Sequence, residues 1–86
     1  MVRLSKALET ERMFHAEIKK AGLNVRLILA PATDGWLGAV VYPDTRESIS
    51  LFELPNLEDA KAKAEGWVRV VHNVKDLIEW IPGKPR

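Results

Sequence analysis

Three short runs of branched and aromatic residues, joined by two turn segments, constrain the fold of this chain most strongly. The runs cover residues 24–30, 36–42 and 48–54, and the connections cover residues 31–35 and 43–47. Each connection contains proline and aspartate, which favour turns. Because β-prone runs joined by short turns pair as antiparallel neighbours, we expect a three-stranded antiparallel sheet.

Helical spacing on both sides of the runs predicts two helices that pack on one face of this sheet. In residues 4–22, apolar side chains recur at intervals of three and four, and Gly22 is expected to end the helix. The second helix begins after Asn56, a good N-cap. Gly66 could end this helix, so that residues 67–72 form a strand, or it could lie inside a helix that continues through residue 72. The unbroken apolar stripe favours the longer helix.

The expected architecture is therefore one α+β domain over residues 1–86, in the order α-β-β-β-α. A short helix that begins after Asn73 and a flexible tail at residues 82–86 complete it. A hydrophobic fraction of 47% and a net charge of +1 exclude a disordered chain. The absence of cysteine excludes disulfides, thiolate zinc sites and a cysteine nucleophile. No apolar run reaches the roughly 20 residues that span a bilayer, and the first residues are charged, so we expect a cytoplasmic protein.

Alternation along the strands assigns the side chains to two faces. The face expected to meet the helices carries an unbroken apolar set: Val25, Leu27, Leu29, Leu37, Ala39, Val41, Ile49 and Leu51. The second face carries three of the six aromatic residues among small ones: Arg26, Ile28, Ala30, Trp36, Gly38, Val40, Tyr42, Ser50, Phe52 and Leu54.

Three explanations of this second face remain open. The C-terminal segment could cover it with Trp80, Ile78 and Ile81. It could instead bind a second copy or another protein. A third reading is that nucleic-acid bases stack on its aromatic rings, beside the cation of Arg26. The predicted partner-binding residues are Trp36, Tyr42, Phe52, Trp80 and Arg26.

The charge distribution favours a protein partner over nucleic acid. Residues 1–26 hold six basic and three acidic groups, residues 27–59 hold one basic and six acidic groups, and residues 60–86 hold six basic and three acidic groups. A phosphate backbone would be repelled by the acidic sheet. As an alternative, nucleic acid could bind the basic faces of the helices, through Arg12, Lys19, Lys20, Lys61, Lys63 and Arg69.

Two stretches resemble known families. The order helix, three strands, helix resembles the double-stranded RNA-binding domain, and residues 58–65 (EDAKAKAE) resemble its second helix. That family needs a lysine cluster at the start of this helix, where Glu58 and Asp59 stand here, so no site residues carry over. The junction LFELPNLEDAK at residues 51–61 resembles that of small sheet-plus-helix modules, including HicB-like antitoxins and integrase arm-binding domains. This resemblance concerns the fold.

No pattern of catalytic residues is present in the sequence. His15 and Glu11 are spaced as two metal ligands on one helix face, but a site needs a third. His72 and the serines lie in no catalytic motif, and no glycine-rich phosphate loop is found. We therefore expect no metal, no cofactor and no enzymatic activity. The sequence predicts a small binding protein that contacts a second copy or a larger partner, a type common among phage and mobile-element accessory or inhibitor proteins.

Overall fold

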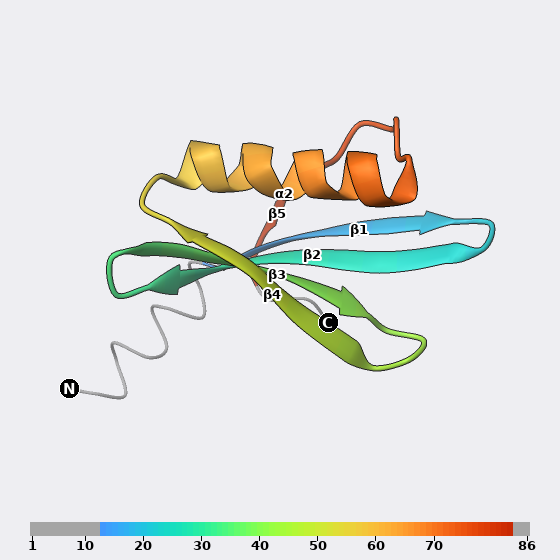
Figure 1. Ribbon diagram of the computed structural model, residues 1–86, viewed down its shortest axis with the longest axis horizontal. Helices are drawn as coiled ribbons and strands as arrows, with labels where there is room; N and C mark the ends of the chain where they lie inside the picture. The colour runs from blue at the N-terminus through green and yellow to red at the C-terminus, as the bar shows by residue number, and fades with distance from the viewer. Residues whose placement is uncertain (1–12, 84–86) are drawn as a thin grey trace.

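The computed structural model describes residues 13–83, which form one five-stranded antiparallel sheet and one helix (Figure 1). The strands are β1 (Phe14–Lys20), β2 (Leu23–Ala32), β3 (Gly35–Tyr42), β4 (Glu47–Leu54) and β5 (Ile81–Pro82), and the helix is α2 (Leu57–His72). The strand order is β4-β3-β2-β1-β5. The chain therefore runs back and forth from β1 to β4, crosses the sheet as α2 and returns beside β1.

The predicted N-terminal helix over residues 4–22 is wrong where the structure describes it, because residues 14–20 form β1. Residues 4–12 lie outside the described part of the chain. Phe14 and Ile18 are four apart, a spacing that fits both a helix and a strand. Ala16 distinguishes a strand from a helix, because only the alternation of a strand places it on the same side as Phe14 and Ile18. It is 1% exposed and pairs with Leu27.

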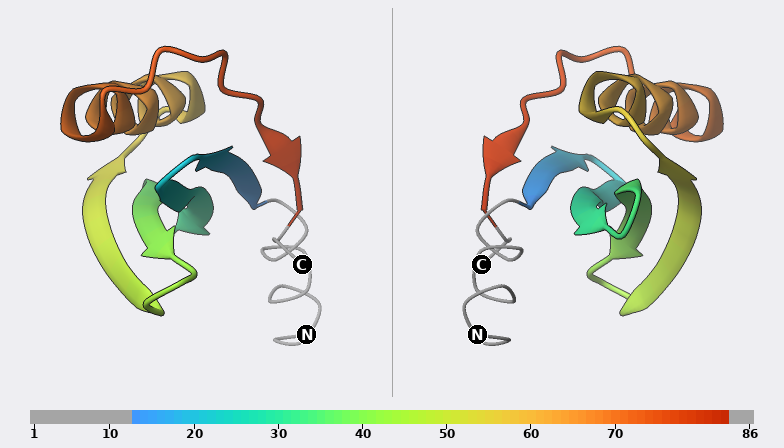
Figure 2. Two further views of the ribbon diagram at one scale, coloured as in Figure 1. Left: turned by 90° about the vertical axis from the view of Figure 1, so that its right-hand side faces the viewer. Right: turned by 90° about the vertical axis from the view of Figure 1, so that its left-hand side faces the viewer.

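The predicted short helix after Asn73 is also wrong. Asn73 ends α2 in the left-handed region, at φ 54°, a conformation that asparagine tolerates better than most residues. The segment 73–80 then crosses to the far edge of the sheet without regular structure and leads into β5 (Figure 2). The three-stranded sheet and the pair of helices on one face are therefore both replaced. The structure has five strands and one covering helix in its described residues.

The central part of the prediction is confirmed. Strands β2, β3 and β4 cover the three predicted runs, and α2 continues through Gly66 to His72. Asn56 caps the helix as expected. Its side chain accepts hydrogen bonds from the backbone nitrogens of Glu58 at 2.8 Å and Asp59 at 3.2 Å, which satisfies donors that have no partner inside the helix.

The predicted assignment of side chains to the two sheet faces is wrong for β3 and for Phe52 and Leu54 of β4. Ala32 pairs with Gly35 across a two-residue turn, so odd-numbered residues of β2 lie opposite even-numbered residues of β3, as Leu27 lies opposite Val40. Residues directly opposite share a face. The core side of β3 therefore carries Trp36, Gly38, Val40 and Tyr42, while Leu37, Ala39 and Val41 point away from α2.

A β-bulge changes the register in β4. Gly38 pairs with Phe52, but the next residue, Ala39, pairs with Ser50. Leu51 is therefore the extra residue, and the strand changes phase there. This shift places Phe52 and Leu54 on the same side as Trp36 and Gly38.

The core lies between α2 and the covered face of the sheet. Its buried members come from β1, β2, β3, α2 and the segment after α2: Ala16, Ile18, Val25, Leu27, Val40, Ala64, Val68, Val74 and Ile78. Val74 and Ile78 show why the segment 73–80 is ordered without a helix, since they contribute to this core. Within residues 13–83, no helix has the length and hydropathy needed to cross a bilayer.

Candidate functional site

The predicted aromatic surface lies beneath α2. Trp36, Tyr42 and Phe52 share one sheet face as expected, but it is the face that the helix covers. Tyr42 and Phe52 pack against the core, and the Phe52 ring fills the space beside Gly38 so closely that no Cβ would fit there. The Trp36 ring lies 5.8 Å from that of Phe14. These rings are therefore partly buried packing groups in this structure.

Trp80 is held against α2. Its indole Nε1 donates a 2.8 Å hydrogen bond to Oε2 of Glu65, and its ring packs against the core. Oε1 of Glu65 lies 3.7 Å from the guanidinium of Arg69. Arg69 in turn donates to the backbone oxygen of Asp76 at 3.1 Å. This network fastens the segment 73–80 to the helix.

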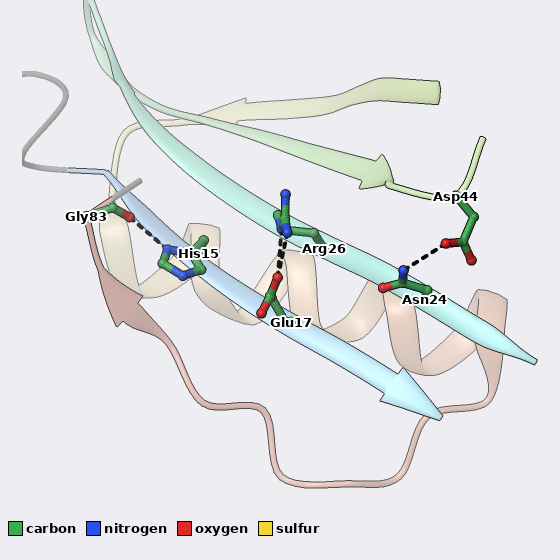
Figure 3. A network of polar contacts seen from close by, with 6 residues as sticks. All are labelled: His15, Glu17, Asn24, Arg26, Asp44 and Gly83. Atoms are coloured by element: carbon green, nitrogen blue, oxygen red, sulfur yellow. Dashed lines mark hydrogen bonds and ion pairs between the residues drawn. The ribbon is translucent and has the colours of Figure 1, made fainter. Parts of the chain in front are cut away.

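Arg26 is the one predicted partner-binding residue on the opposite face of the sheet (Figure 3). Its guanidinium contacts the Glu17 carboxylate at 2.6 Å and 3.1 Å, directly across the β1–β2 pair. The hydrogen bond from Arg26 lowers the pKa of Glu17. On the same face, Nδ1 of His15 lies 2.8 Å from the backbone oxygen of Gly83. The structure therefore does not bring Arg26 together with the aromatic residues.

The basic residues of the nucleic-acid alternative are dispersed. Arg12 lies outside the described residues, and Lys19 and Lys20 lie on β1, which corrects their placement on a helix. Lys61, Lys63 and Arg69 lie on α2. Several of these cations are already engaged: Lys20 with Asp76 at 3.3 Å, Lys61 with Glu58 at 3.7 Å, and Arg69 with Glu65. They form no continuous basic face on the helix.

A small pocket of about 370 Å³ lies at the end of the sheet beside the last turn of α2. Tyr42 and His72 are among the residues that line it, with the phenol oxygen 2.9 Å from Nε2 of the imidazole. Burial, followed by the nearby charge of Glu47, raises the pKa of Tyr42. The described residues contain no cluster of three metal-binding side chains. The contact between Tyr42 and His72 ties the end of α2 to β3.

The outer face of α2 carries exposed apolar side chains beside a groove. A shallow groove of about 440 Å³ is lined by Ala62, Lys63, Gly66, Trp67, Val70 and Val71. We call these six residues the helix patch. Val70 is 84% exposed and Val71 is 53% exposed. No heavy atom lies within 4 Å of the place where a Cβ at Gly66 would stand. The groove is therefore apolar and open.

The sequence-based reasoning missed the helix patch because it followed one apolar stripe. That stripe placed Val71 on the buried side, whereas the residues that the structure buries are Ala60, Ala64 and Val68. A second series at the same interval, Ala62, Gly66 and Val70, lies two residues later, and two residues correspond to about 200° around a helix. An apolar series on each side of one helix is the signal that could have revealed the patch.

Comparisons of the chain with protein-family models, with curated proteins and with solved structures found no match.

Proposed function

We propose that this protein acts as a non-enzymatic binding protein through protein–protein contact, and that the helix patch is its contact surface. The exposure of Val70, on the side of α2 away from the buried series, together with that of Val71 in the same groove carries the proposal. Burying one such side chain stabilises a complex by about 1.5–3 kcal/mol before the cost of association. A larger cluster of exposed apolar groups marks an interaction site more often than isolated ones do.

A second copy of this chain is the partner that the helix patch fits. If two α2 helices cross antiparallel with Gly66 on the two-fold axis, Val70 of each copy lies opposite Ala62 of the other. A large side chain then meets a small one at both places, and the glycines let the helix axes approach closely. Such a contact is self-complementary, as a two-fold dimer requires.

The charges on α2 support the same antiparallel arrangement. The first turn carries Glu58 and Asp59, and the last turn carries Arg69 and His72. In an antiparallel pair, the acidic start of one helix lies beside the basic end of the other. The helix dipoles oppose one another in the same favourable sense. Lys63 lies at the rim, where its charge stays in water.

The expected dimer is weak. Sixteen residues of α2 span about 24 Å at a rise of 1.5 Å each. A contact between two such helices buries less than the roughly 800 Å² per partner of a standard interface. We therefore expect a dissociation constant in the micromolar range, so that the protein exchanges between a second copy and other partners.

Sedimentation equilibrium tests the proposal over concentrations from low micromolar to near millimolar. We expect the average mass to rise from one chain toward two. Val70→Lys should weaken association by about tenfold or more and leave folding intact, because the side chain is already exposed. Leu37→Lys is the matched control, since Leu37 is 37% exposed on the opposite side of the sheet.

Two results would contradict the proposal. A wild-type chain that stays at the mass of one copy throughout the series would exclude self-association. Loss of association in Leu37→Lys but not in Val70→Lys would move the interface to the sheet. Circular dichroism of each variant shows that the fold is kept.

A further inference from the structure

We propose that the free edge of β4 binds an extended, basic segment of another protein as an additional strand of the sheet. This surface lies on a different element from the helix patch and does not depend on the dimer. It gives the protein a second, chemically different contact.

The sheet has two unequal edges. The edge beside β1 is covered in part by β5, a two-residue strand that includes Pro82 and pairs with Phe14 and His15. The other edge is β4, an eight-residue strand that pairs only with β3 among the described residues. Alternate residues of an antiparallel edge strand point their N–H and C=O groups away from the sheet. These groups can pair with an incoming strand about 26 Å long at 3.3 Å per residue.

The first half of β4 is the part best suited to pairing. Residues 47–50 are all exposed, and they precede the bulge at Leu51 that bends the strand. The side chains of Ser48 and Ser50 are small, and Ile49 is 43% exposed. β4 contains neither lysine nor proline, which are common protections of an edge strand.

The charge along this edge selects the partner. Asp44, Glu47 and Glu53 all lie in β4 or in the turn before it, and Arg46 is the one basic residue between positions 27 and 59. Asp44 accepts a hydrogen bond from the neutral Asn24 side chain at 3.1 Å. Glu47 and Glu53 form no ion pair with any described residue. Glu53 lies opposite Leu37 on the side away from α2, whereas Glu47 lies opposite Tyr42 on the α2 side. An incoming strand whose alternate lysine or arginine residues lie on the side away from α2 would place a cation beside Glu53, and the acidic charge of the whole edge would attract it.

The same charges disfavour a second copy at this edge. Pairing of β4 with its own copy would bring two acidic edges together, because β4 of each chain carries Glu47 and Glu53 and no basic residue. Like charges brought close together disfavour such a pair. The edge is therefore suited to a different, basic protein, whereas the helix patch is suited to a second copy.

A synthetic peptide tests the inference. The probe is a short, end-blocked peptide of alternating lysine and valine. We expect it to bind and to slow amide exchange at alternate residues between positions 47 and 50, measured by NMR. A copy of the peptide methylated on its alternate backbone nitrogens keeps the charge but loses the outward donors, and should bind about tenfold or more weakly.

Charge-reversed variants distinguish binding at the β4 edge from nonspecific attraction of the peptide to acidic groups elsewhere on the protein. Glu53→Lys should weaken binding of the lysine–valine peptide by about tenfold. Glu79→Lys, the control, makes the same change in charge at an exposed position on the segment that leads to β5, and should leave binding within about twofold.

Three outcomes would overturn the inference: no binding of the peptide, equal binding of its N-methylated copy, or slowed exchange at sites other than β4. Repeating the titration with Val70→Lys separates the two proposals. If the edge works as inferred, this variant binds the peptide with unchanged affinity whether or not the helix patch forms a dimer.

Discussion

The two sides of α2 have nearly the same side chains and opposite environments. The inner side presents Ala60, Ala64 and Val68, none of which is more than 1% exposed. The outer side presents Ala62, Gly66 and Val70 at the same spacing, and Val70 is 84% exposed. Small residues followed by valine therefore serve equally well to pack on a sheet or to remain available for another surface.

The neighbours of each series explain which side the sheet covers. Leu57 and Trp67 flank the inner series and are partly buried, and Trp67 packs against the core. Glu58, Asp59 and Lys63 flank the outer series and are exposed. Burying charged groups is costly unless they are paired. The helix therefore turns its charged flank to water, and the outer apolar residues are exposed with it.

The largest effect that we expect comes from adding the same charge to each side. Val68→Asp should lower the free energy of unfolding by about 3–5 kcal/mol, because an unpaired carboxylate would enter the core. Val70→Asp should change it by less than about 0.5 kcal/mol. Urea denaturation at low protein concentration measures both values. Similar losses in the two variants would show that the two sides do not differ as the structure describes.

Two glycines, Gly38 beneath α2 and Gly66 on its outer side, should show opposite changes in stability when each is replaced by alanine. Gly38→Ala should cost about 1–3 kcal/mol, because the new methyl group would displace the Phe52 ring. Gly66→Ala should stabilise the monomer by about 1 kcal/mol, because alanine is favoured over glycine inside a helix. The space around Gly66 is open, so the new methyl group meets no other atom. Thermal unfolding of dilute protein measures both changes. A gain in stability for Gly38→Ala would contradict the close packing beneath α2.

The smallest effect concerns the far side of the sheet, where Arg26 lowers the pKa of Glu17. A carboxyl group with a lowered pKa stabilises the fold above its unfolded value of 4.5, and this contribution is lost as the pH falls through the folded value. We therefore expect wild-type stability to fall more steeply below about pH 4.5 than that of Glu17→Gln. Urea denaturation at several pH values measures the slopes. Parallel slopes would show that the pair adds nothing to stability, and added salt should reduce any difference.

The confirmed parts of the prediction share a local physical cause. The three central strands follow from branched residues between turn formers, and the start of α2 follows from the Asn56 cap. These signals depend on residues close in sequence. The errors occurred where local signals were ambiguous. The interval between Phe14 and Ile18 fits both the period of a helix and that of a strand. Asn73 is of a residue type that can either begin or end a helix.

The candidate sites required information that connects distant positions. The odd-numbered and the even-numbered side chains of β3 are both apolar, so periodicity could not show which of them face the helix. The two-residue turn before Gly35 sets the register and so places the even-numbered side chains on the α2 side. For this reason Trp36, Tyr42 and Phe52, predicted as a partner surface, lie under α2. The helix patch was visible as a second apolar series, but only the burial of Ala60, Ala64 and Val68 identifies the outer side.

The sequence by itself determined the β2–β4 meander, the helix that follows it and the concentration of acidic residues between positions 27 and 59. Only the tertiary structure decided that residues 14–20 form a strand rather than a helix, that β5 pairs with the start of β1 while β4 is the opposite edge of the described sheet, and which side of α2 is exposed. The reason is physical. Turns, caps and charge depend on residues near one another in the chain, whereas edges and faces exist only after distant segments have paired and packed.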